Sequence, residues 1–246
     1  MQATGSPKID DTVVMPDFSN DKLPGVEAFD KTAEILASEA DINKGMADPQ
    51  SMARAVAAAD PAQRAHIDEV IRSQAIPAFL AAVAKMGPTV NGWIQPHITG
   101  NYGRDYLTRS IVDFTRIWAD SPREAVYFGG GGFDGSQTYT ETYAKDAVPD
   151  LKVYSAWSVT AVDHTNHRVI ANPLNRYVLG DRSGLQSNAD GSMTLVFAPK
   201  LPDGVPQANW LPTQAGQEYD LTYRLYVPTK DVVQGRYYPP MLSIKP

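Results

Sequence analysis

The sequence contains no cysteine among its 246 residues. That absence excludes disulfides, thiolate nucleophiles and thiolate metal ligands, and it is compatible with reducing and oxidising compartments alike. No run of about eighteen apolar residues occurs, so the sequence predicts no membrane span. The polar start Met1–Ser6 lacks the apolar core of a signal peptide. We expect a soluble protein, which would be periplasmic or secreted if a leader had been removed and cytoplasmic otherwise.

Basic residues are in the minority, because 22 Lys and Arg stand against 28 Asp and Glu and give a formal net charge of −6. Nucleic-acid-binding proteins usually carry a basic patch for the phosphates, and no basic run occurs here. We therefore expect no nucleic-acid partner. A hydrophobic content of 43% and a charged content of 20% are ordinary for a globular protein with its own core.

Three segments differ in pattern along the chain. Residues 1–24 mix proline, aspartate, serine and glycine, and are expected to form an extended N-terminal arm. Residues 25–89 show apolar positions at helical spacing and predict a helical segment. Residues 90–246 are rich in Trp, Tyr, Gly and Thr, and their short β-rich runs predict a β-domain.

The helical segment contains two clear start signals. Asp48-Pro49 and Asp60-Pro61 each place an N-cap acceptor before a proline in the first turn of a helix. Pro77 lies inside the last predicted helix and should kink or split it near Ala75, because proline lacks the N–H of a regular helix.

The β-domain is predicted from alternation and turns. Residues 153–162 alternate apolar and polar side chains, and Asp163–His167 and Asn188–Gly191 are typical hairpin connections. Gly129–Gly132 lacks the Gly-Lys-Ser/Thr ending of a phosphate loop, so it is expected to be a flexible loop. Together these signals predict the α+β class: a mainly antiparallel β-sandwich or jelly roll with an N-terminal helical segment.

No catalytic signature settles the chemistry. The Gly-x-Ser-x-Gly elbow of serine hydrolases does not occur. A glycosidase needs two facing carboxylates, but the sequence brings no two of the available ones together; these are Asp105, Asp134, Glu141, Asp181 and Glu218. His164 and His167 fit an exposed polar turn better than a metal site. We predict no metal and no cofactor, and leave open whether the protein is an enzyme.

Several blocks, read in order, resemble one family. They are Asn172–Arg182, Asn188–Leu195, Asn209–Pro212 with Ala215-Gly216, Leu221–Pro228 and Gly235–Pro240. Together with Asn101–Arg109 and other shorter matches, they make residues 90–246 similar to the bacterial domain of unknown function 1214 family. Members of that family usually form the C-terminal half of proteins whose N-terminal half is domain of unknown function 1254. The resemblance implies a jelly-roll β-sandwich with helices packed on or beside it.

Polar residues of these blocks are the candidate ligand contacts, because Arg forks and Asn amides can hold hydroxyl-rich or acidic groups. The candidates are Tyr102, Arg104, Asp105, Asn172, Asn175, Arg176, Asp181, Arg182 and Trp210. The same residues could equally satisfy a buried corner, with Arg104 and Arg182 paired to Asp105 and Asp181.

Two functional hypotheses follow. The first is a protein that binds or processes a saccharide, or another small polar ligand, in a groove lined by the Tyr102–Tyr106 and Asn172–Arg182 blocks. The alternative is a non-catalytic structural or assembly module, whose arm and helices would make the subunit contacts of a homo-oligomer.

Overall fold

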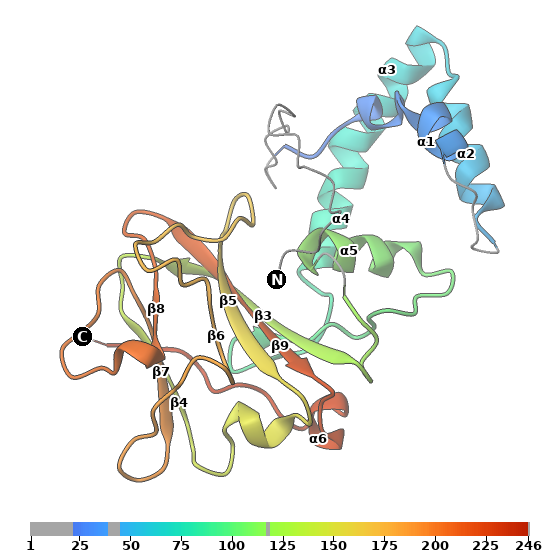
Figure 1. The fold of residues 1–246 in the computed structure, drawn as a ribbon. Coiled ribbons are helices and arrows are strands. Elements are labelled where there is room, and N and C mark those ends of the chain that lie inside the picture. The colour runs from blue at the N-terminus through green and yellow to red at the C-terminus, as the bar shows by residue number, and fades with distance from the viewer. Residues whose placement is uncertain (1–21, 39–44, 117–118, 246) are drawn as a thin grey trace, which may run out of the picture.

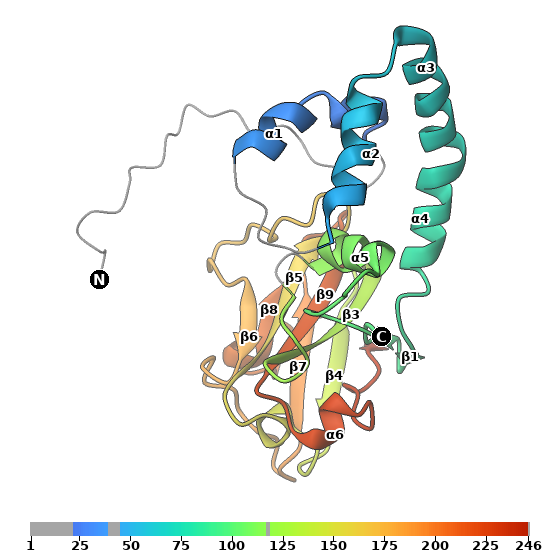
Figure 2. The ribbon, with the colours of Figure 1, turned by 90° about the vertical axis from the view of Figure 1, so that its right-hand side faces the viewer.

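The computed structural model describes residues 22–38, 45–116 and 119–245. These residues form an α+β fold with two sheets and several helices. The strands gather in one body, while α1 (Thr32–Ser38), α2 (Ala47–Ala57) and α3 (Pro61–Val70) stand away from it (Figures 1 and 2). The next helix, α4 (Ile76–Val83), leads back from α3 towards the strands.

The helix starts follow the sequence in part. Asp60 caps α3 as expected: its carboxylate accepts the N–H groups of Ala62 and Gln63, and the Gln63 side chain accepts the Asp60 N–H. The prediction for Asp48 is wrong, because α2 begins at Ala47 and Asp48 lies inside the first turn. A carboxylate there still complements the positive end of the helix dipole.

Proline 77 coincides with a change of helix type. A π-turn, Ile71–Ala75, joins α3 to α4, and Pro77 occupies the first turn of α4. The wide turn accommodates a residue that cannot donate to the preceding carbonyls. The irregularity therefore falls at the position that the sequence indicates, and the helix continues beyond it.

Ten strands in the described part of the chain form the two sheets. The six-stranded sheet is antiparallel throughout and has the order β1 (Thr89–Val90), β2 (Trp93–Ile94), β3 (Ala125–Asp134), β9 (Glu218–Tyr226), β5 (Trp157–Asp163) and β6 (Val178–Gly180). The four-stranded sheet has the order β10 (Ser243–Ile244), β4 (Tyr139–Tyr143), β7 (Met193–Ala198) and β8 (Trp210–Pro212), with β7 and β8 parallel. The other helices are α5 (Tyr106–Arg116) and α6 (Lys230–Val233).

One core joins the two sheets. Along β9 every second residue from Tyr219 to Leu225 is buried, and along β5 Trp157, Val159 and Ala161 are buried in the same way. These side chains share a single cluster with residues of β4 and β7. The alternate residues of β9 and β5 therefore lie on the opposite face of the six-stranded sheet, because strand side chains alternate.

The expectation of a flexible loop at Gly129–Gly132 is wrong, since β3 runs through it. Gly129 and Gly130 pair with β9, and a bulge follows before Phe133. A Cβ on Gly130 would lie 3.1 Å from the Trp93 ring, and one on Gly131 would lie 2.2 Å from the Asp220 carboxylate. The glycines therefore serve close packing rather than mobility.

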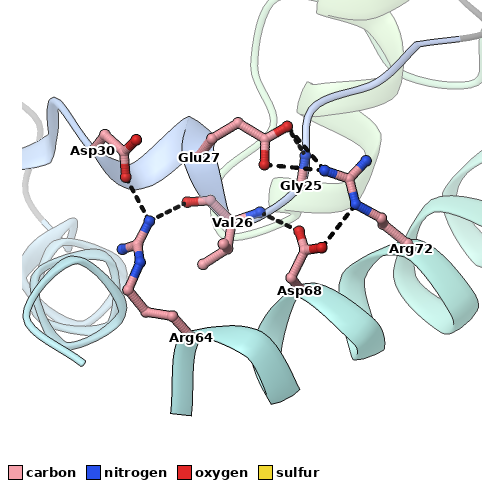
Figure 3. A network of polar contacts seen from close by, with 7 residues as sticks. All are labelled: Gly25, Val26, Glu27, Asp30, Arg64, Asp68 and Arg72. Atoms are coloured by element: carbon pink, nitrogen blue, oxygen red, sulfur yellow. Dashed lines mark hydrogen bonds and ion pairs between the residues drawn. The ribbon is translucent and has the colours of Figure 1, made fainter. Parts of the chain in front are cut away.

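A polar network fastens the chain around Gly25 to α3 (Figure 3). Asp68 accepts the Val26 N–H at 2.8 Å, and Arg72 bridges Asp68 at 2.8 Å and Glu27 at 3.0 Å. The hydrogen bond from the Val26 N–H has the largest part in holding the pKa of the Asp68 carboxyl below its usual range, and the hydrogen bond from Arg72 adds to this effect. A Cβ on Gly25 would collide with Asp68, so this close approach requires glycine.

We expect Asp68→Ala to release the Val26 amide, because it removes the acceptor of that N–H and one of the two carboxylate partners of Arg72. Hydrogen exchange of the Val26 amide should accelerate several-fold, while amides of β9 keep their rates. Glu34→Ala is the matched control, since Glu34 forms only an exposed pair with Lys31. Unchanged Val26 exchange in Asp68→Ala would contradict the role of the network.

Candidate functional site

A cavity of about 920 Å³ lies between the helices α4 and α5 and the outer face of the six-stranded sheet. Its volume is typical of sites for small organic molecules. The lining combines residues of the helices, of β2, β3, β5 and β9, and of the turn after β5: Leu23, Phe79, Val83, Met86, Ile94, Ser110, Asp113, Phe114, Thr115, Gly129, Gly130, Gly131, Val162, His164, Asn166, His167, Asp220, Leu221, Thr222 and Arg224.

The floor of the cavity is polar and regular. Asp220, Thr222 and Arg224 alternate with the core residues of β9 and are half-buried. Thr222 has Gly129 beside it on β3 and Thr160 beside it on β5. Since alternate strand residues are about 6.7 Å apart, Arg224 and Asp220 mark ends of the floor separated by about 13 Å.

The roof of the cavity is apolar on its α4 side. Phe79 and Val83 of α4 line it, and the Phe79 ring meets Phe114 of α5 edge to face with centroids 5.4 Å apart. Besides Phe114, α5 contributes three polar side chains to the lining: Ser110, Asp113 and Thr115. An apolar wall opposite the polar side chains of β9 suits a molecule with one apolar and one polar side.

One end of the floor carries a paired histidine. His164 Nδ1 and Asp220 Oδ1 are 2.7 Å apart, and the same carboxylate oxygen accepts the Gly132 N–H at 3.0 Å. The hydrogen bond with Asp220 raises the pKa of His164 above its usual value, against the opposing effect of burial. The pair therefore stabilises the fold below the unfolded-state pKa of 6.5, and this contribution is lost as the pH rises through the folded-state pKa.

We expect Asp220→Asn to lower the pKa of His164, because the amide carries no charge to favour the imidazolium. An NMR titration of the histidine ring protons measures the shift directly. The control Glu69→Gln changes an exposed carboxylate on α3 and should leave the His164 titration unmoved. A His164 pKa that stays the same in Asp220→Asn would refute the assigned coupling.

The nine candidate ligand contacts chosen from the sequence are not among the described residues that line this cavity. Asn172, Arg176 and Trp210 come together elsewhere and bind backbone. The Asn172 side chain accepts a hydrogen bond from the Arg176 N–H and donates one to the Arg176 carbonyl. The Arg176 side chain donates to the carbonyls of Trp210 and Gln207. The Trp210 indole donates to the Ala198 carbonyl at 2.9 Å. These bonds fasten a turn to β8, which is the structural interpretation of the cluster.

Three further candidates of that block are more exposed. Asn175 has a positive φ of 49° and accepts the Tyr177 hydroxyl at 3.1 Å. Asp181 and Arg182 approach each other at 3.8 Å, as the sequence suggests, but the Arg182 side chain is 92% exposed. Such a pair contributes little to stability.

The Tyr102–Tyr106 block lies before and at the start of α5. Asp105 caps that helix through the Thr108 N–H at 3.0 Å and the Thr108 hydroxyl at 2.7 Å. Both hydrogen bonds hold the pKa of Asp105 below its usual range, and the bond from the Thr108 N–H has the larger effect. Arg104 is exposed and Tyr102 is half-buried. A ligand groove on these two blocks stays a prediction.

Sequence reasoning missed Arg224, Asp220 and His164 as cavity residues. A signal existed in residues 218–226, where Asp220, Thr222 and Arg224 alternate with apolar residues. Alternation predicts a polar strand face, but it does not reveal that helices cover that face. The covering depends on contacts between segments far apart in sequence.

Within residues 22–38, 45–116 and 119–245, no group of three or more His, Cys, Asp or Glu side chains is placed to hold a metal ion. Nor do these ranges contain a helix of the length and apolarity needed to cross a membrane.

Fold and site together define an α+β protein with a cavity of small-molecule size between two helices and a sheet. Residues 126–230 match the family "Protein of unknown function (DUF1214)". The resemblance to this family predicted from the motif blocks is therefore confirmed for residues 126–230, a shorter range than the blocks suggest. No curated protein matches the chain.

Solved structures give distant similarity. The VPA0106 protein from Vibrio parahaemolyticus is 18% identical with a TM-score of 0.51, over 82% of this chain and 52% of that one. An uncharacterized protein from Burkholderia cenocepacia is 14% identical with a TM-score of 0.42, over 85% of this chain and 45% of that one. The chain thus spans about half the length of each, and the first likeness concerns the fold alone.

Proposed function

We propose that this protein binds a small amphipathic organic molecule in the cavity beneath α4 and α5. The observation that carries the proposal is the half-buried polar face of β9 opposite the apolar side chains of Phe79, Val83 and Phe114, with a cavity of about 920 Å³ between the helices and the sheet. The apolar part of the ligand packs on Phe79, Val83 and Phe114, and its polar part meets the strand floor. A saccharide, which the sequence analysis predicts as the ligand, is one of the polar head groups used in the experiment below.

Two variants with the same substitution test this location. Thr222→Trp places an indole on the cavity floor, whereas Thr142→Trp places one on the exposed face of β4. The probe is octyl glucoside below its micelle-forming concentration, with 1-octanol as a second probe, and binding is followed by calorimetry. We expect wild type and Thr142→Trp to bind and Thr222→Trp to lose binding. Equal binding by both variants, or none by wild type, would refute the proposal.

An assembly role is the second candidate, and the helices favour it. None of α2, α3 and α4 contains a buried residue, and Ile35, Met52 and Leu80 are 61%, 70% and 40% exposed. Helices without a buried residue leave their apolar side chains available to a second molecule, and such side chains mark a protein contact where they form a contiguous patch. Light scattering on wild type and Met52→Lys tests it: a dimer that Met52→Lys dissociates supports assembly, and a monomeric wild type excludes self-assembly through these helices.

We also propose that the two sheets form an open, jelly-roll-like sandwich over residues 90–246, preceded by a helical segment at 25–89. The arm predicted at residues 1–24 falls almost entirely outside the described residues. The shared core between the sheets supports the sandwich. The parallel pairing of β7 and β8 departs from a fully antiparallel arrangement.

A further inference from the structure

The guanidinium of Arg224 lies in the cavity without an ion pair. Arg64, Arg72 and Arg236 each form an ion pair with a carboxylate at the protein surface, and Arg176 donates to two backbone carbonyls. Arg224 instead lines the cavity and donates through Nη1 to a neutral group, the Thr160 hydroxyl, at 3.1 Å. Within the described ranges it forms no ion pair.

That arrangement leaves binding capacity on the guanidinium. Arginine has five N–H donors, of which the bond to Thr160 uses one. A half-buried cation gains most from a partner of opposite charge, and the arginine fork matches the two oxygens of a carboxylate. We infer that the cavity takes an amphipathic carboxylic acid, whose carboxylate binds Arg224; this inference rests on the proposed function.

The surroundings of Arg224 support this head group. Thr222 and Thr160 lie next to each other on neighbouring strands and offer hydroxyl donors on the same face. Gly129, paired with Thr222 on the other side, has no side chain to obstruct an approaching group. A carboxylate can therefore be held by a charged fork and hydroxyls together.

Charge also sets the direction of the ligand. Asp220 lies at the opposite end of the floor from Arg224, paired with His164. Carboxylates repel a second anion, so the acid group belongs at the Arg224 end. The apolar chain then runs beneath Phe79 and Phe114, where the cavity is apolar.

Calorimetry on the full chain with four probes of equal chain length tests the inference. Octanoate, 1-octanol, octylamine and octyl glucoside each have a chain of eight carbons, counting the carboxyl carbon of octanoate, and carry different head groups. We expect wild type to bind octanoate at least about tenfold more tightly than 1-octanol, as one desolvated charged hydrogen-bonded pair implies. Arg224→Gln should remove that preference while 1-octanol affinity stays the same, and Arg224→Lys should restore it only in part.

Arg236→Gln is the matched control, because it removes an exposed arginine outside the cavity lining and should keep the preference. The inference is overturned if wild type binds octanoate and 1-octanol equally, if octyl glucoside is preferred, or if the preference survives in Arg224→Gln. Each of these outcomes leaves the proposed function standing. If no octyl probe binds wild type, the proposed function itself fails.

Discussion

Glu141→Gln is expected to stabilise the folded protein, with a gain that grows as the pH rises towards 8. Glu141 lies in β4 with no exposed surface, and its Oε2 accepts the hydroxyl of Tyr223. Its Oε1 has no hydrogen-bond partner in the described structure. Burial raises the pKa of Glu141 to about 8, although the Tyr223 hydroxyl acts in the opposite direction. The carboxyl is therefore protonated in the folded protein at neutral pH.

The sign of the pH dependence follows from that raised pKa. Below the unfolded-state value of 4.5 both states hold the proton, so Glu141 exerts no penalty there. Between 4.5 and about 8 only the folded state holds it, and stability falls by about 1.4 kcal/mol per pH unit. Glutamine carries no such proton, so the variant should be several kcal/mol more stable than wild type near pH 8.

Urea unfolding of both proteins from pH 5 to pH 8.5 measures this difference. Glu218→Gln is the control, since Glu218 is an exposed carboxylate on β9 and should keep the wild-type pH dependence. Parallel curves for wild type and Glu141→Gln across this range would show that Glu141 is not held neutral in the core.

Asn209→Ala is expected to destabilise the fold by about 3 kcal/mol, because it leaves buried backbone groups without partners. Asn209 is 1% exposed. Its amide accepts the Gln186 N–H and donates to the carbonyls of Gln186 and Thr194, each at 2.8 Å. One side chain thus fastens the loop before β7, the strand β7 and the start of β8.

The matched variant is Asn188→Ala, in which an exposed asparagine loses bonds to the Ser192 and Thr194 hydroxyls. We expect it to change stability by less than about 1 kcal/mol, since water replaces exposed hydrogen bonds. Denaturant midpoints of the two variants and wild type give the comparison. Equal losses in Asn209→Ala and Asn188→Ala would contradict a special role for Asn209.

Local signals predicted much of the fold. Alternation identified the β5 region, and the Asp60 cap marked the start of α3. The glycines of β3 misled prediction because their conformation depends on β9, which lies some 90 residues later and supplies the pairing. Local composition indicates flexibility there, whereas packing against Trp93 and Asp220 requires small residues.

The candidate site was harder to predict for a related reason. The Asn172–Arg182 stretch attracts attention through its polar composition, yet Asn172 and Arg176 bind the backbone of the protein itself. Arg224 and Thr222 look like outward residues of an ordinary strand. These residues line a cavity because α4 and α5 pack over that strand. No short-range sequence pattern encodes that packing.

The most direct test of ligand binding in the cavity uses the methyl groups of methionine. Met86 lines the cavity, whereas Met193 lies in the core between the sheets and Met52 is 70% exposed on α2. In protein labelled with [13C]methyl-methionine, with Met86→Leu to assign the signal, octanoate and octyl glucoside are titrated in turn. We predict a saturable shift of the Met86 methyl signal with at least one probe, while Met193 and Met52 stay unmoved. A Met86 signal that does not move with either probe, or saturable shifts confined to Met193 or Met52, would contradict binding in this cavity.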